Sequence, residues 1–232
     1  MTPVSTASPG SYGSSAELRE VSEGRPKPPT IERVASSWLP TEFGDFQIVV
    51  YRVHDPEAHP SLAKEYLALV KGDVAGAEDL PVRLHSECLT GEVFGSMKCD
   101  CRDQLAAAQR FVQEQGRGVI LYLRQEGRGI GLANKIRAYA LQDQGADTIE
   151  ANRKLNLPID ARRYEAAELI LEDLGVRSVR LLTNNPLKLR GFSGRSVRTL
   201  GRIPLEIHPN RHSQGYLAVK RDRMGHLLSH QD

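Results

Sequence analysis

The residues best suited to chemistry in this chain are its three cysteines, Cys88, Cys99 and Cys101, which fall within fourteen consecutive positions. An odd number of clustered cysteines does not suit a disulfide framework, whereas thiolates are ligands that zinc favours. Three protein ligands leave one position open for water, and a catalytic zinc lowers the pKa of that water to about 7. The cluster therefore predicts a zinc site that makes a nucleophile available at neutral pH.

Two alternatives remain open from these residues alone. His85 lies three residues before Cys88 and could act as a fourth ligand, which would close the site and make the zinc structural. The cysteines could instead be buried, reduced thiols that act as small hydrophobic side chains. That second alternative gives no reason for the cysteines to cluster, so a metal is the favoured interpretation.

A glycine-rich turn is the second candidate. The apolar run Val119–Leu123 leads into Arg124–Gly131 and then into a helical pattern, an arrangement typical of phosphate sites. The spacing fits neither a dinucleotide fingerprint nor a P-loop. The cations around the turn are Arg124, Arg128, Lys135 and Arg137. A solvated basic helix face is the alternative, but Glu126 beside Arg128 in so glycine-rich a turn favours a site.

Two polar segments complete the candidates. Residues 147–162 form a polar connection in which Asp160 and Arg162 could share a side, although Asp160 could also simply cap the helix that follows. The run Thr183-Asn-Asn-Pro186, followed by Lys188, ends a predicted strand with hydroxyl, amide and ammonium groups. Such groups suit recognition of a polar ligand, although Asn-Pro also marks a turn.

The elements that must position these residues alternate between strand and helix patterns. Apolar, β-branched runs predict strands at 46–53, 66–70, 82–87, 119–123, 178–182 and 202–207. Helical periodicity predicts helices around 105–112, ending at Gly116, and around 132–140, 164–174 and 216–228. The expected fold is a single α/β domain of mixed β-sheets flanked by helices over residues 41–232. Residues 1–40, rich in Pro, Ser and Gly, are expected to form a flexible extension.

The bulk composition limits the partners. A net charge of +2 is too mild for a protein that coats nucleic acid, although local basic clusters could bind a small anion such as a polyphosphate. No apolar run is long enough for a membrane span and no secretory signal pattern begins the chain. We therefore expect a cytoplasmic protein, with its thiols reduced, that binds neither nucleic acid nor membrane.

These motifs, in this order, resemble the GTP cyclohydrolase II family. The resemblance rests on Arg83–Gly91, Cys99-Asp-Cys101, Leu123–Gly131, Asn134–Asp143 and Leu181–Pro186, and it covers about Phe43 to Leu228. It implies a GTP cyclohydrolase II-like fold, a homodimer, and GTP as the substrate. It also implies hydrolytic opening of the imidazole ring with release of formate and pyrophosphate, giving a diaminopyrimidinone ribosylamino monophosphate in the first step of riboflavin biosynthesis.

The resemblance also implies roles for residues. Cys88, Cys99 and Cys101 match the ligands of one zinc ion per subunit, which makes His85 a neighbour and not a ligand. Asp160 and Arg162 match residues assigned as general base and nucleophile, and Tyr139 matches a tyrosine that could order water. Because arginine rarely loses its proton, stabilising phosphate charge is the easier role for Arg162. Mg²⁺ is expected with the triphosphate. The positions that match GTP contacts are Arg83, Leu84, His85, Ser86, Glu87, Gln104, Glu126, Gly127, Arg128, Thr148, Thr183 and Lys188.

Departures from the family pattern are few. Arg102 stands where glycine is common, and Arg163 follows Arg162 where an acidic residue is common. Both add positive charge near the expected triphosphate, yet neither removes a matched catalytic group. Two other functions stay open: an enzyme that retains the formyl group for a specialised metabolite, and a catalytically silent GTP-binding paralogue. Retention of the three cysteines, Asp160 and Arg162 argues against the silent paralogue.

Overall fold

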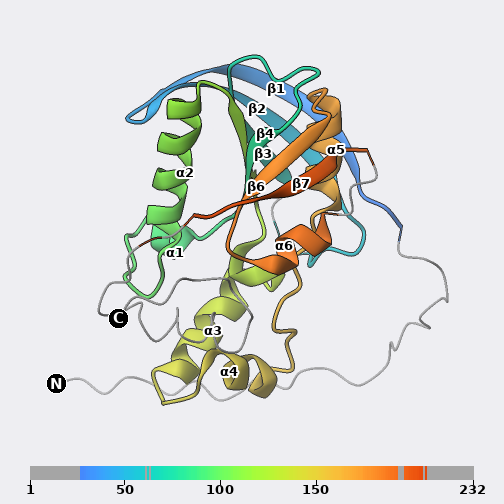
Figure 1. Ribbon diagram of the computed structural model, residues 1–232. Coiled ribbons are helices and arrows are strands. Elements are labelled where there is room, and N and C mark those ends of the chain that lie inside the picture. Colours follow the sequence, from blue (N-terminus) through green and yellow to red (C-terminus); the bar gives the residue numbers. More distant parts are fainter. Residues whose placement is uncertain (1–26, 61, 63, 193–195, 206, 208–232) are drawn as a thin grey trace.

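The computed structural model describes residues 27–60, 62, 64–192, 196–205 and 207. Within them the chain forms one seven-stranded sheet in the order β1-β2-β3-β5-β4-β6-β7, flanked by helices (Figure 1). The predicted class, an α/β domain of mixed sheet with flanking helices, is confirmed. The helix predicted at 216–228 lies outside the described residues.

One half of the sheet is antiparallel. It consists of β1 (Thr30–Thr41), β2 (Gly44–His54) and β3 (Glu65–Lys71), each paired with the next. In β2 and β3 buried residues alternate with more exposed ones, the pattern of strands that cover a core on one face. The predicted boundary of the extension is therefore wrong: residues 30–40 belong to β1. Most of β1 is exposed, so its sequence lacks the apolar alternation that would have revealed a strand.

The other half of the sheet is parallel. It consists of β5 (Gly118–Leu123), β4 (Leu80–Ser86), β6 (Ser178–Leu182) and β7 (Arg198–Ile203), and β3 joins β5 antiparallel. Strands β4, β5 and β6 are nearly continuous apolar runs because helices cover both faces. The last strand was predicted at 202–207 but ends at Ile203. Its sequence shows no clear apolar alternation that would mark its ends. The ends are set instead by its pairing with β6.

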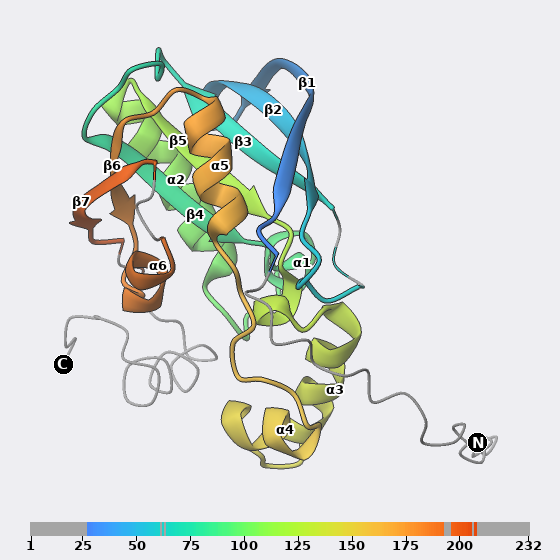
Figure 2. The same cartoon turned by 90° about the vertical axis from the view of Figure 1, so that its right-hand side faces the viewer.

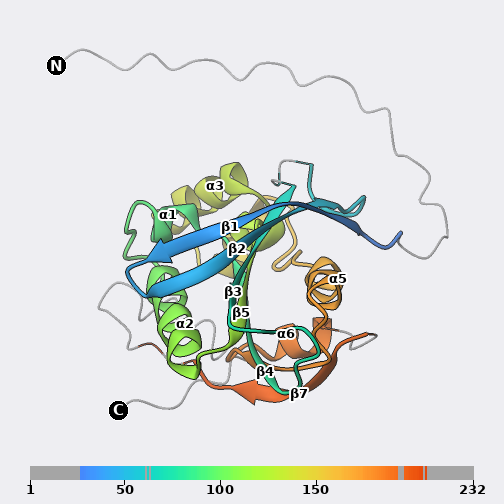
Figure 3. The same ribbon diagram turned by 90° about the horizontal axis from the view of Figure 1, so that it is seen from above.

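Two helices cover opposite faces of this sheet (Figure 3). Helix α2 (Cys101–Gln115) packs Ala108 and Val112 against Ile120 on one face. Helix α5 (Glu165–Asp173) buries Ile170 and Leu171 on the other face, where the larger core lies. Burying such side chains contributes roughly 1.5–3 kcal/mol each. The connection from β4 to β5 and the connection from β5 to β6 run in opposite directions along the sheet. Because such crossovers are right-handed, the helices in these two connections lie on opposite faces.

The remaining helices gather at one end of the sheet (Figures 1 and 2). They are α1 (Leu89–Glu92), the short 3₁₀ helix η1 (Glu126–Gly129), α3 (Leu132–Gln142), α4 (Thr148–Lys154) and α6 (Pro186–Gly191). Helix α4 corrects the predicted polar connection at 147–162. A capping box between Asp147 and Glu150 begins this helix, an Asp-x-x-Glu signal readable in the sequence. No described helix has the length and apolar character needed to cross a membrane.

The carboxyl ends of the parallel strands deliver the candidate residues. Strand β4 ends two residues before Cys88, β5 ends before the Arg124–Gly131 turn, and β6 ends before Thr183. Parallel neighbours place these ends at the same edge, which is where ligands bind in open α/β sheets. The fold thus gathers segments separated by about a hundred positions of the sequence into one region.

Candidate functional site

The three cysteines meet at the end of β4. Their Sγ atoms all lie within 4.8 Å of one another, and those of Cys88 and Cys99 are 3.6 Å apart. Sulfur ligands about 2.3 Å from one tetrahedral ion lie about 3.8 Å apart, so the cluster has the dimensions of a zinc site. A Cβ atom on Gly91 would lie 2.8 Å from the sulfur of Cys99, so only glycine lets α1 pass this close to the sulfurs.

Of the three thiols, only Cys88 has surroundings that favour thiolate, because the pKa values of Cys99 and Cys101 are raised, with the neighbouring sulfurs and burial among the causes. Hydrogen bonds with Cys101 and Cys99, together with the charge of Lys135, lower the pKa of the Cys88 thiol below its usual value. The Lys135 Nζ atom lies 3.2 Å from the Cys88 sulfur and 2.8 Å from Glu126 Oε1. Within the described part of the chain, these cysteines are the one group of His, Cys, Asp and Glu side chains with metal-ligating geometry.

His85 belongs to a different network. Its Nε2–H donates to Glu92 Oε1 at 2.7 Å, and the Tyr122 hydroxyl donates to Glu92 Oε2 at 2.5 Å. The His85 and Tyr122 rings stack, with centroids 5.7 Å apart. Burial lowers the pKa of His85, so the ring is neutral at pH 7. Its buried Nδ1 atom has no hydrogen-bond partner among the described residues, which leaves a lone pair for a ligand.

Arg83 links the sheet to the cysteine-bearing helix. Its guanidinium donates to Leu182 O at 2.8 Å and to Gln104 Oε1 at 2.5 Å, and Gln104 in turn donates to Asp100 Oδ2. Asp100 is the N-cap residue of α2, directly before Cys101. Burial lowers the pKa of Arg83 to about 10, which leaves it cationic at neutral pH. The side chains of Cys101 and Arg162 are both near enough to act electrostatically on Arg83, so Arg83 is close to the sulfurs and to the segment that carries Asp160 and Arg162 (the Asp160 segment).

Asp160 and Arg162 form a closed ion pair. Arg162 Nε and Nη2 donate to the two Asp160 oxygens at 2.9 and 2.5 Å, and the Arg162 amide donates at 3.1 Å. Burial by itself raises the pKa of Asp160, but these hydrogen bonds and the Arg162 charge outweigh it and lower the pKa below its usual value. The alternative of a helix cap is excluded, because the N-cap residue of α5 is Tyr164.

The glycine-rich turn holds this ion pair in place. Arg128 and Gly129 both adopt left-handed conformations, with φ of 60° and 89°. A Cβ atom on Gly129 would lie 2.8 Å from the backbone carbon and oxygen of Ala161, and the Ala161 amide donates to Arg128 O at 2.9 Å. Because Gly129 has no side chain, the Asp160 segment can approach the turn this closely. Arg128 is near enough for its charge to lower the pKa of Asp160.

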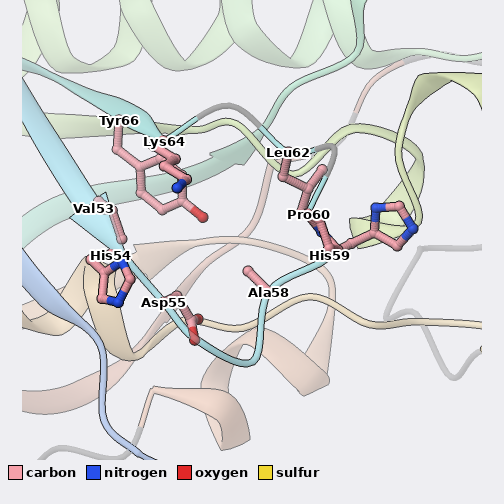
Figure 4. Close-up of a pocket in the computed structure, with 9 residues that line it drawn as sticks. All are labelled: Val53, His54, Asp55, Ala58, His59, Pro60, Leu62, Lys64 and Tyr66. Carbon is pink, nitrogen blue, oxygen red and sulfur yellow. The ribbon is translucent and has the colours of Figure 1, made fainter. Parts of the chain in front are cut away.

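A second tether runs to the β2–β3 loop. The Gln125 side chain accepts from the Arg163 amide at 3.0 Å and donates to the Arg163 carbonyl at 2.6 Å. Arg163 Nε lies 3.0 Å from Asp55 Oδ2, and the Asp55 side chain is only 8 % exposed. Asp55 and Tyr66 also line a cavity of about 160 Å³ beneath this loop (Figure 4). Arg163 thus ties the Asp160 segment both to Gln125 and to the β2–β3 loop.

Tyr139 projects from α3 toward the cysteines. Its ring lies beneath two ammonium groups, with Lys98 Nζ at 4.8 Å and Lys135 Nζ at 5.7 Å from the centroid. Burial raises the pKa of Tyr139 to about 12, although Lys135 and a hydrogen bond with Thr90 act in the opposite direction. The phenol is therefore protonated at neutral pH and can donate a hydrogen bond.

The other predicted site residues are placed as follows. Glu87 accepts from Arg124 Nε at 3.2 Å, and Glu126 accepts from the Leu89 amide at 2.7 Å. The carbonyl of Leu84 accepts from Lys188 Nζ at 2.6 Å, and Thr183 Oγ1 accepts from the Asn185 amide. Ser86 ends β4, Gly127 lies in η1, and Thr148 is the first residue of α4. All but Thr148 come from the strand ends or from the segments next to them.

The sequence did not reveal three residues that hold site residues in place. Glu92 orients His85, Asp55 anchors Arg163, and Lys135 touches a cysteine, although it was noticed only as one cation near the glycine turn. Each acts on a residue far away in the sequence or on another element, so no local spacing announces the pair. Only the i to i+4 relation of Lys135 and Tyr139 on one helix face was available as a hint.

A comparison with known families shows which family this chain belongs to. The family described as GTP cyclohydrolase II matches residues 32–204. The chain belongs to the GTP cyclohydrolase II family. This confirms the resemblance and identifies the protein as an enzyme of that family. The match begins within β1, which agrees with the placement of that strand inside the domain.

Relatives within the family cover most of the chain. GTP cyclohydrolase-2 of Acinetobacter baylyi is 52% identical over 203 residues, covering 87% of this chain and 98% of the relative. The riboflavin biosynthesis protein RibBA of Chlorobium phaeovibrioides is 47% identical over 199 residues, covering 86% of this chain but 47% of that longer protein. A solved structure of RibBX, a two-domain 3,4-dihydroxy-2-butanone 4-phosphate synthase from A. baumannii, has 22% identity and a TM-score of 0.42, covering 73% of this chain and 40% of that one.

Gly129→Ala tests the contact between the turn and the Asp160 segment. We expect kcat to fall by about tenfold to a hundredfold, because the added Cβ displaces Ala161 and with it the ion pair. Gly145→Ala is the matched control: Gly145 has a similar φ of 97°, but a Cβ added there would meet no atom within 4 Å. It should lose only stability, about 1–2 kcal/mol of strain. Equal kcat values for the two variants would contradict the positioning role of the turn.

Arg163→Ala tests the tether to Asp55. We expect about a tenfold loss of kcat, because a small displacement of a catalytic segment is costly. The exchange Asp55→Arg with Arg163→Asp should restore part of this loss by rebuilding the ion pair. Arg180→Ala removes an exposed ion pair with Asp79 and should leave kcat unchanged. A wild-type kcat for Arg163→Ala, measured by steady-state kinetics, would show that the tether is dispensable.

Proposed function

We propose that this protein hydrolyses GTP with the help of zinc, opening the imidazole ring and releasing formate and pyrophosphate. The observation that supports this most directly is the meeting of three cysteine sulfurs within 4.8 Å at the end of β4, with the Asp160–Arg162 pair near enough to act on Arg83 as Cys101 does. Ring opening needs activated water, and pyrophosphate release needs charge at the phosphates. The two clusters suit these two tasks.

Cys88, Cys99 and Cys101 would hold one zinc ion per subunit. When bound, zinc activates water at neutral pH and polarises carbonyl groups, which is the chemistry that both hydrolytic steps on the ring require. Three protein ligands leave a position for water or substrate, since His85 is directed to Glu92. Mg²⁺ would accompany the triphosphate, because it takes oxygen ligands from substrate phosphates.

Tyr139 would orient water beside the cysteines. Its phenol stays protonated at neutral pH, since burial raises its pKa to about 12. The hydroxyl can therefore donate a hydrogen bond to water or to a developing oxyanion without giving up its proton. The ammonium groups of Lys98 and Lys135 both lie over its ring.

Asp160 and Arg162 would act in sequence. In the free enzyme Arg162 neutralises Asp160 and lowers the pKa of its carboxyl group, which makes it a weak base. A bound triphosphate competes for the guanidinium, because phosphate oxygens accept the same bidentate hydrogen bonds. Once Arg162 turns to the phosphates, Asp160 regains basicity and can accept a proton. Substrate binding would thus create the base at the moment it is needed.

The guanosine would lie along the end of β4. The Nε atom of Arg83 and the Nδ1 atom of His85 are buried without hydrogen-bond partners among the described residues, as expected of groups that await a ligand. Both Glu126 oxygens are held by the protein, whereas Glu87 is contacted by Arg124 at the longer distance of 3.2 Å. We therefore assign Glu87 to accept hydrogen bonds from the N1–H and the exocyclic amino group of guanine. Gln104, Gly127, Arg128, Thr148, Thr183 and Lys188 complete the proposed set.

The product would enter riboflavin biosynthesis. A relative 47% identical to this chain carries that pathway in its name, and another is named GTP cyclohydrolase-2. The enzyme would act in the cytoplasm, where thiols remain reduced, and as a homodimer.

The test follows formate, pyrophosphate and the nucleotide product together, using purified protein with GTP and Mg²⁺. Both small products should appear, and a zinc chelator or Cys99→Ser should abolish formate release. Pyrophosphate without formate would identify instead an enzyme that retains the formyl group. GTP binding without turnover would identify a silent paralogue, and full activity of metal-free protein would overturn the zinc mechanism.

Arg162→Ala tests the role at the phosphates. We expect pyrophosphate release to slow by about a hundredfold or more, since a cation that stabilises transition-state charge is lost. Arg162→Lys should recover part of the rate, because it keeps the charge but not the bidentate fork. Unchanged turnover in Arg162→Ala, measured by the same product assay, would show that this residue is not part of the machinery.

A further inference from the structure

Lys135 occupies an unusual place for a lysine. It lies on α3 and is only 9 % exposed, although lysines are almost never buried unless they are paired. Its Nζ atom contacts two groups on other elements, Glu126 Oε1 at 2.8 Å and the Cys88 sulfur at 3.2 Å. A lysine retained only to neutralise Glu126 would have no need to reach the sulfur.

Glu126 links this lysine to the backbone of the segment that follows β4 and carries Cys88, called the cysteine loop here. Its Oε1 atom accepts from Lys135 Nζ and from the Gly127 amide at 2.8 Å each. Its Oε2 atom accepts from the Leu89 amide at 2.7 Å, directly after Cys88. One carboxylate is therefore bonded both to the cation and to the peptide next to Cys88.

The charges at this point explain why a cation is needed. Three thiolates around one divalent ion leave an excess negative charge in a buried site, and the carboxylate of Glu126 adds another beside it. Without Lys135 the carboxylate and the Cys88 sulfur would face each other as like charges. An N–H···S hydrogen bond also draws electron density from the ligand, and such outer contacts tune the metal and its affinity.

We propose that Lys135, held by Glu126, is a positioning residue of the cysteine centre: it screens Glu126 from Cys88 and orients the Cys88 thiolate through an N–H···S hydrogen bond. This inference rests on the proposed metal site. It assigns to the chain a cation that takes part in metal binding and touches neither the metal nor, in the proposed mechanism, the reacting atoms. The Glu126–Lys135 pair is thus part of the centre, and not a separate structural ion pair.

The test measures metal binding and not turnover. Metal-free protein is titrated with Zn²⁺ against a competing chelator, and with Co²⁺ while the sulfur-to-cobalt charge-transfer absorption is recorded. For Lys135→Met we expect zinc affinity to fall by about tenfold to a hundredfold, the usual cost of losing an outer-shell partner, and the cobalt absorption to shift. Lys135→Met with Glu126→Gln should regain part of the affinity, because removing the carboxylate charge relieves the repulsion.

Lys98→Met is the matched control. Lys98 lies over the same Tyr139 ring as Lys135, but its ammonium is paired with Asp143 at the surface. This variant should bind both metals as the wild type does. If Lys135→Met does not fold, judged by circular dichroism, Lys135→Gln serves in its place, since it has polar N–H groups but no charge, and it should show a smaller loss in the same direction.

The outcomes separate this inference from the proposed function. Wild-type protein that binds no zinc would overturn the metal site and this inference with it. Wild-type protein that binds zinc, together with a folded Lys135 variant of equal affinity and unchanged cobalt spectrum, would overturn only the role of Lys135. A loss of affinity that Glu126→Gln fails to relieve would refute the screening role.

Discussion

The parallel pairing of β4 with β5 is the constraint on which the site depends. Its register sets His85 opposite Tyr122 and Ser86 opposite Leu123, so both strands end at the same level. The cysteine loop and the glycine-rich turn then leave the sheet side by side, and Glu126 can bond to the Leu89 amide. A one-residue slip would turn every side chain of β4 to the opposite face and separate the two clusters.

Three buried or partly buried cations around this edge are held by partners from other elements. Arg83 joins β4 to α2, Lys135 joins α3 to the cysteine loop, and Arg163 joins the Asp160 segment to the β2–β3 loop. Burying such charges costs free energy unless they are paired, and breaking one pair leaves its partner uncompensated. The arrangement stabilises the native state little but restricts it to one geometry, which is what catalysis by positioned groups requires.

The core elements were predictable because their signals are local. Strands β2 and β3 and helices α2, α3 and α5 show apolar periodicity, and β4, β5 and β6 are short apolar runs. Gly116 ends α2 in a left-handed conformation, as its position predicts. Strand β1 was missed because it is an exposed edge, with Trp38 75 % exposed, and edge pairing leaves no periodic apolar signature. Helix α4 was missed although its Asp147 capping box stood in the sequence.

The sequence by itself determined the family, the α/β class and the cysteine cluster, because residue types and short spacings carry that information. Tertiary structure alone decided that His85 turns to Glu92, that Gly129 makes room for Ala161, and that Lys135 reaches the Cys88 sulfur. Each of these contacts joins elements whose relative placement comes from strand order and helix packing. No local pattern encodes that placement, since it is set by how the whole chain buries its apolar surface.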